Sequence, residues 1–109
     1  MNFNEYQKES RKNAIYPAIG SNFYFPVIGL AGETGEVAEK VKKILRDKDG
    51  MVDDQSREEV KKELGDVLWY LSQIASEFDL SLEDVATGNL EKIKNRKERD
   101  MIHGNGDNR

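Results

Sequence analysis

The residues best suited to chemistry in this chain are two pairs of acids, each with a three-residue spacing inside a helical pattern. The first pair is Glu33 and Glu36, and the second is Glu63 and Asp66. Residues three apart on an α-helix lie on one face, one turn apart. Two such pairs on neighbouring helices could aim four carboxylates at one point, where a hard divalent cation such as Mg²⁺ would bind them.

A second interpretation is that these acids are ordinary charges on solvated helix faces, since the chain is 35% charged. On helical wheels, however, both pairs are displaced from their apolar stripes in the same rotational sense. Antiparallel neighbours with facing stripes would therefore let the four carboxylates converge. Helix-interior glycines cost roughly 0.5–1 kcal/mol each relative to alanine, and close approach of a backbone, metal or ligand would account for them. Four glycines accompany the acids: Gly29, Gly32, Gly35 and Gly65.

The apolar residues that must position these acids recur with a helical period, and no β-alternation is visible. We predict an all-α, four-helix bundle-like fold with helices over about 2–14, 27–46, 56–78 and 82–96. Capping boxes formed by Ser56 with Glu59 and by Ser81 with Asp84 are expected to start the last two helices. Residues 1–97 are expected to form the helical domain, and residues 98–109 a polar tail.

Two features outside the acid pairs favour ligand binding or self-association. Trp69 lies nearly opposite the apolar stripe of its helix, so either a second subunit or a ligand is expected to cover it. Asn89, Lys92 and Arg96 fall on one strip of the last predicted helix. This strip is either a solvated basic edge or a grip for phosphate oxygens, because lysine and arginine bind anions as a point charge and a fork.

Bulk properties limit the possible partners. The chain has 109 residues, which is one domain, and its small core favours oligomerisation. A net charge of −4 argues against a nucleic-acid polymer as partner. The sequence lacks a signal peptide and a long apolar run, so we expect a cytoplasmic protein without membrane contact. The only histidine, His103, lies in the tail, which argues against di-iron and zinc sites.

The chain resembles the MazG-like nucleoside triphosphate pyrophosphohydrolases of the all-α NTP pyrophosphatase superfamily. That family shows a Glu-Glu-x-x-Glu segment followed by Glu-x-x-Asp, and the resemblance covers roughly residues 3 to 97. The first Glu of the usual doublet is Gly32 here, which is a departure from the pattern. The matching segments are Gly32-Glu33-Thr34-Gly35-Glu36, Glu63-Leu64-Gly65-Asp66 and the helix from Asn89 to Arg96.

The resemblance implies hydrolysis of an NTP or dNTP to the nucleoside monophosphate and pyrophosphate, with Mg²⁺ as cofactor and Mn²⁺ as a possible substitute. It implies that the metal ligands and catalytic residues are Glu33, Glu36, Glu63 and Asp66. On physical grounds, we expect one of these carboxylates, on the Glu33–Glu36 side, to orient or deprotonate the attacking water. The substrate-binding residues would be Asn89, Lys92, Arg96 and Trp69. A homodimer or homotetramer in nucleotide metabolism would follow. A house-cleaning role, control of the nucleotide pool and alarmone turnover are all open.

Two alternatives to the enzyme are open at this point. The first is a non-catalytic nucleotide-binding or helical interaction module that retains the metal site, and Gly32 favours it. The second is a purely structural helical protein whose acids are solvated. The sequence does not indicate the base or the sugar of the nucleotide.

Overall fold

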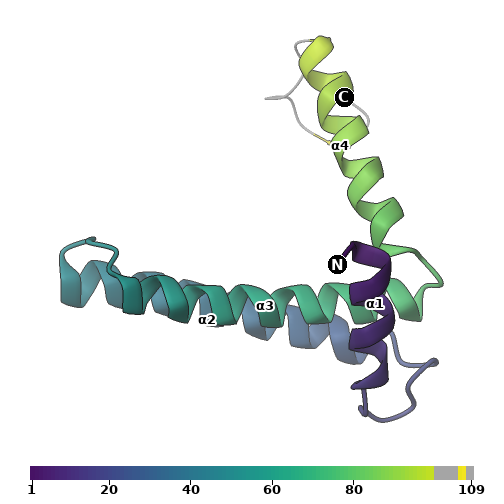
Figure 1. Cartoon of the computed structure of the whole chain (residues 1–109), viewed down its shortest axis with the longest axis horizontal. Coiled ribbons are helices and arrows are strands. Elements are labelled where there is room, and N and C mark those ends of the chain that lie inside the picture. Colours follow the sequence, from purple (N-terminus) through teal and green to yellow (C-terminus); the bar gives the residue numbers. More distant parts are fainter. Residues whose placement is uncertain (100–105, 108–109) are drawn as a thin grey trace.

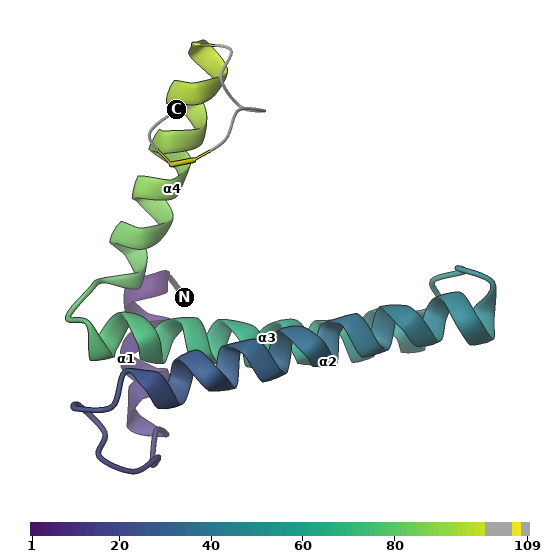
Figure 2. The ribbon, with the colours of Figure 1, turned by 180° about the vertical axis from the view of Figure 1, so that it is seen from behind.

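The computed structural model describes residues 1–99 and 106–107, and all regular secondary structure in these ranges is helical. The helices are α1 (Phe3–Lys12), α2 (Tyr24–Lys48), α3 (Asp54–Glu77) and α4 (Leu82–Glu98). Helices α2 and α3 lie side by side as a long antiparallel hairpin, as Figures 1 and 2 show, while α1 crosses one end and α4 rises away from that end. The all-α prediction is confirmed. His103 lies outside the described residues, as does most of the predicted tail.

The start of α3 differs from the predicted capping box. Asp53 is the N-cap, because its side chain accepts a hydrogen bond of 2.8 Å from the backbone N–H of Ser56. Ser56 is instead buried in the first turn, where its hydroxyl accepts a bond of 2.9 Å from Lys48 Nζ. The Ser56–Glu59 box was therefore wrong, because an aspartate three residues earlier starts the helix sooner. The Ser81 cap is confirmed, since its hydroxyl accepts from the Asp84 N–H at 3.2 Å.

The contact between α1 and α3 is built from buried polar side chains. Ser10 and Ser72 are buried and their hydroxyls lie 2.8 Å apart. Gln73 donates to the Ser10 hydroxyl at 3.2 Å and accepts from Arg11 Nη1 at 3.0 Å. Each bond is directional, so the set fixes how α1 sits on α3 where apolar packing alone would tolerate sliding.

The described part of the chain leaves much apolar surface open. Helix α4 makes no contact with α2 within the described residues, so the four helices do not enclose one shared core. Leu45 is 65% exposed on α2 and Leu90 is 68% exposed on α4. Soluble monomers seldom expose large contiguous apolar patches. Completion of the fold by further copies stays a prediction, and this surface motivates it.

Gly29 is required by a close packing contact between α2 and α3. A Cβ at this position would overlap the ring of Tyr70, whereas nothing lies within 4 Å of a Cβ built on Gly32. We expect Gly29→Ala to lower the free energy of unfolding by about 1–3 kcal/mol through overpacking. The control Gly32→Ala should raise it by about 0.5–1 kcal/mol, because alanine favours helix over glycine. Urea denaturation of both variants measures the difference; equal effects would contradict the contact.

Candidate functional site

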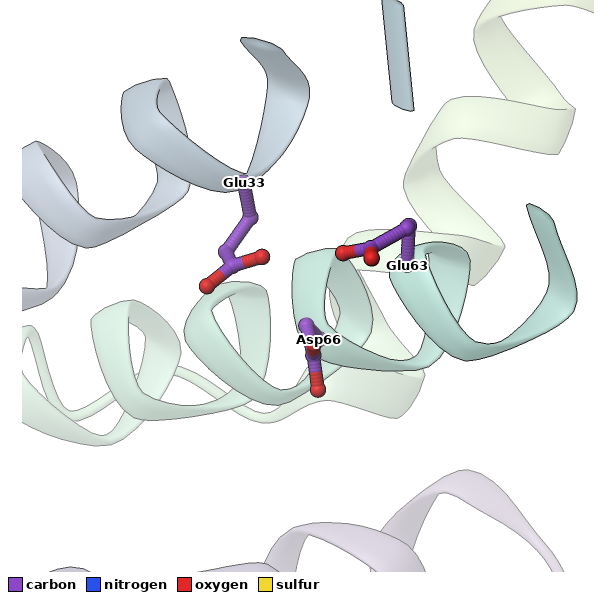
Figure 3. Close-up of side chains that lie close together, drawn as sticks. All are labelled: Glu33, Glu63 and Asp66. Atoms are coloured by element: carbon purple, nitrogen blue, oxygen red, sulfur yellow. The ribbon is translucent and has the colours of Figure 1, made fainter. Parts of the chain in front are cut away.

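Three of the four predicted acids meet across the α2–α3 hairpin. Glu33 of α2 and Glu63 and Asp66 of α3 each offer a carboxylate oxygen, and these oxygens all lie within 4.8 Å of one another. Figure 3 shows Glu33 reaching from one helix while the other two project from successive turns of the next. Glu33 and Glu63 are 30 positions apart in the sequence, and the antiparallel pairing of the two helices brings their side chains together.

The electrostatics of this carboxylate trio (Glu33, Glu63 and Asp66) are unfavourable without a cation. Burial raises the pKa of the Glu33 carboxyl, and the negative charges of Asp66, Glu63 and Glu36 raise it further. Within the described residues, no lysine or arginine forms an ion pair with the trio. Carboxylate oxygens are the hard ligands that Mg²⁺ prefers, so the residues present fit this ion.

Glu36 lies outside the trio. It is exposed, one turn beyond Glu33 on α2. Its charge nevertheless contributes to the raised pKa of Glu33, so the two carboxylates are electrostatically coupled. Its role as a fourth metal ligand stays a prediction.

The predicted phosphate-binding strip is not brought to the trio within one chain. Asn89, Lys92 and Arg96 lie on α4, which makes no contact with α2 in the described part of the protein. Figure 1 shows α4 leading away from the hairpin. If this strip serves the trio, another copy of the chain has to supply it.

Trp69 lies on α3, three residues beyond Asp66, and is half-buried. Its ring stands edge-on to the ring of Tyr70, with centroids 5.2 Å apart and an interplanar angle of 90°. Tyr70 in turn packs against Gly29 of α2. Trp69 therefore lies one turn beyond Asp66 on α3 with its ring against Tyr70. Its predicted role in substrate binding stays a prediction.

Sequence reasoning missed a buried glutamate, Glu77, at the end of α3. The Glu77 side chain is only 1% exposed. Its carboxylate accepts bonds from Arg11 Nη2 and the Tyr16 hydroxyl, both at 2.6 Å. It also accepts from the backbone N–H groups of Gly20 at 2.8 Å and Asn22 at 2.7 Å. These four donors tie α1 and the loop before α2 to α3, so Glu77 has a structural role.

A sequence signal for Glu77 existed. Glu63, Asp66, Tyr70, Gln73 and Glu77 alternate steps of three and four residues, which places them on one strip of α3. This strip runs along the edge of the apolar stripe, where a polar residue is buried once another helix packs there. The same strip therefore carries two of the trio's acids and the buried glutamate.

A family comparison covers both acid pairs and α4. Residues 27–100 match the model of the MazG nucleotide pyrophosphohydrolase domain. The chain therefore belongs to the MazG nucleotide pyrophosphohydrolase family.

Among individual proteins, the chain is similar to the "Gene 37 protein" of Mycobacterium phage L5. The two are 45% identical over 114 residues, and the alignment covers all of both chains. No solved structure shows significant similarity. None of the described helices is long and apolar enough to cross a membrane.

Proposed function

We propose that this protein is a Mg²⁺-dependent nucleotide pyrophosphohydrolase that cleaves an NTP or dNTP to the nucleoside monophosphate and pyrophosphate. The observation that carries the proposal is the carboxylate trio across the α2–α3 hairpin. Membership of the MazG family supports the class of reaction. Mn²⁺ is the expected substitute cation, since it also prefers oxygen ligands.

Each side chain has a defined part in the proposed reaction. Glu33, Glu63 and Asp66 would hold the ion, with Glu36 as the fourth ligand. When bound, Mg²⁺ would offset the triphosphate charge and favour in-line attack by water at phosphorus. One carboxylate on the Glu33–Glu36 side of the hairpin would orient that water and accept its proton on an oxygen atom.

The exposed apolar surface supports self-association as part of the proposal. A groove of about 610 Å³ lies at the far end of the hairpin, lined by apolar side chains of both helices. On α4, Leu90 and Ile93 are also exposed. Covering such surfaces with a second copy would stabilise both partners by removing apolar area from water. The apolar lining of the groove includes Val41, Ile44, Leu45, Val52, Val60 and Leu64.

A second copy would also complete the site. Helix α4 makes no contact with α2 within the described residues and leads away from the hairpin of its own chain (Figure 1). We therefore assign Asn89, Lys92 and Arg96 to the phosphates of a nucleotide bound at the partner's trio. Lysine and arginine there would offset phosphate charge, and asparagine would add a hydrogen bond.

Mixing two inactive variants tests this arrangement. Glu63→Gln and Lys92→Ala should each be nearly inactive alone. In a mixed dimer, the carboxylates of one chain and the strip of the other remain intact, so one of the two sites is rebuilt. Half of randomly formed pairs are mixed, so co-refolded protein should recover about a quarter of wild-type activity. No recovery, in protein shown to be dimeric by light scattering, would contradict the shared site.

The reaction itself is tested with a panel of all NTPs and dNTPs in the presence of Mg²⁺ or Mn²⁺. The expected product is pyrophosphate rather than orthophosphate, and a chelator should stop its release. Gly32, which replaces the first Glu of the family doublet, favours the alternative of a non-catalytic nucleotide-binding module. Calorimetric binding of a nucleotide without turnover over hours would select that alternative.

A further inference from the structure

Arg96 is unusual among the residues of α4. Every residue from Thr87 to Asn95 is exposed, yet the Arg96 side chain is only 8% exposed. Its guanidinium donates hydrogen bonds to the carbonyl oxygens of Gly106 and Asp107, which lie beyond the end of the helix in the sequence. Among the described residues, the polar partners of this arginine are therefore Gly106 and Asp107, and none belongs to the helical hairpin.

The tail contact resembles the binding of an anion to the basic strip. Arg96 Nη2 donates to the Asp107 carbonyl at 2.7 Å and lies 3.5 Å from the Gly106 carbonyl. One carboxylate oxygen of Asp107 lies 3.3 Å from Lys92 Nζ and 3.5 Å from Arg96 Nη2. A single oxygen thus bridges Lys92 and Arg96, which is the position that a phosphate oxygen would take.

The guanidinium is only partly satisfied by the tail. Arg96 Nε is buried and has no hydrogen-bond partner among the described residues. An unpaired buried donor is costly, and the cost is removed when an acceptor reaches it. A phosphate group can accept from Nε and Nη2 together. The Asp107 carboxylate instead lies 3.5 Å from Nη2, and Nε has no hydrogen-bond partner among the described residues.

We propose that Asp107 is an internal ligand of the Lys92–Arg96 anion site and competes there with a phosphate group of the nucleotide. This inference rests on the proposed function, which assigns the strip to phosphates. Binding of the nucleotide then requires displacement of the tail, which reduces the apparent affinity by the fraction of molecules in which the site is open. The tail should raise KM and leave kcat unchanged, because it acts before the chemical step.

The full-length variant Asp107→Asn tests the proposal, with inorganic tripolyphosphate as the probe and a chelator present so that no metal contributes. Exposed charge pairs have modest strength, so we expect Asp107→Asn to bind tripolyphosphate about two- to fivefold more tightly than the wild type. Glu91→Gln is the matched control, since it removes the same charge from α4 next to Lys92. The control should shift the affinity less than Asp107→Asn does.

Lys92→Ala separates the two possible failures. Suppose that Lys92→Ala weakens tripolyphosphate binding while Asp107→Asn and Glu91→Gln have equal effects. The proposal that Asp107 competes with phosphate is then overturned, and the strip remains an anion site. If Lys92→Ala leaves the affinity unchanged, the strip does not bind phosphates, and the tail proposal falls together with that assignment. In turnover assays, a lower KM at constant kcat for Asp107→Asn supports the proposal, and a changed kcat at constant KM overturns it.

Discussion

Replacement of Glu63 by glutamine is expected to reduce kcat by about 10³-fold or more, and to leave the helical structure intact. The side chain is one of three whose carboxylate oxygens lie within 4.8 Å of one another. Glutamine keeps its shape but removes the charge that would hold the cation. A metal supplies several kcal/mol of transition-state stabilisation, and each 1.36 kcal/mol is tenfold in rate. The release of pyrophosphate with time measures the loss.

Thermal unfolding gives an independent measurement for the same variant. Millimolar Mg²⁺ should raise the Tm of the wild type, because a ligand that binds only the folded state stabilises it. The shift should be absent in Glu63→Gln.

Glu58→Gln is the control for both measurements, since Glu58 is an exposed acid on the same helix outside the trio. It should retain activity and the Mg²⁺ shift. Full activity of Glu63→Gln, or equal losses in the two variants, would remove the trio from the mechanism.

The helices and the meeting of the acids were predictable because both depend on local periodicity. Apolar spacing placed the helices, and the position of each acid pair relative to its stripe predicted convergence across an antiparallel hairpin. The structure confirms that geometry for Glu33, Glu63 and Asp66. Glu36, the fourth predicted acid, lies outside the trio. The predicted start of α3 was wrong because Asp53 and Ser56 are both good N-cap residues. The sequence alone did not indicate which of the two side chains accepts a hydrogen bond from a free backbone N–H of the first turn.

The direction of α4 was not predictable in the same way. Its cap at Ser81 and its length follow from local signals, but its angle to the hairpin depends on contacts with α1 and α3. Those contacts involve residues distant in sequence, including Gln7, which accepts from the Leu82 N–H at 2.8 Å and donates to the Leu80 carbonyl at 2.9 Å. The separation of the basic strip from the trio is therefore a property of the tertiary structure.

Glu77 shows a different limit of sequence reasoning. Most glutamates are exposed, so an acid near the end of a helix is assigned to solvent by default. Its burial depends on donors from α1 and from the loop before α2, which are 55 to 66 positions away in the chain. The heptad-like strip that contains it gives the position on the helix but not the identity of the donors.

Replacement of Glu77 by glutamine is expected to lower the free energy of unfolding at pH 7 by about 3 kcal/mol. Burial by itself would raise the pKa of this carboxyl. The hydrogen bonds from Tyr16, Arg11 and the backbone N–H groups of Asn22 and Gly20 outweigh that effect and lower the pKa from 4.5 to about 2. Glutamine cannot carry the charge that these donors stabilise, and it leaves the Arg11 guanidinium without its ionic partner.

The pH dependence of stability should follow the same carboxyl. Its pKa in the folded protein is below the ordinary value, so its contribution is complete above pH 4.5 and is lost as the pH falls from 4.5 towards about 2. Urea denaturation at a series of pH values should show this decline in the wild type and a shallower one in Glu77→Gln. Glu91→Gln, which removes an exposed charge, should keep the wild-type slope. Parallel curves for all three proteins would show that the network around Glu77 does not stabilise its charge.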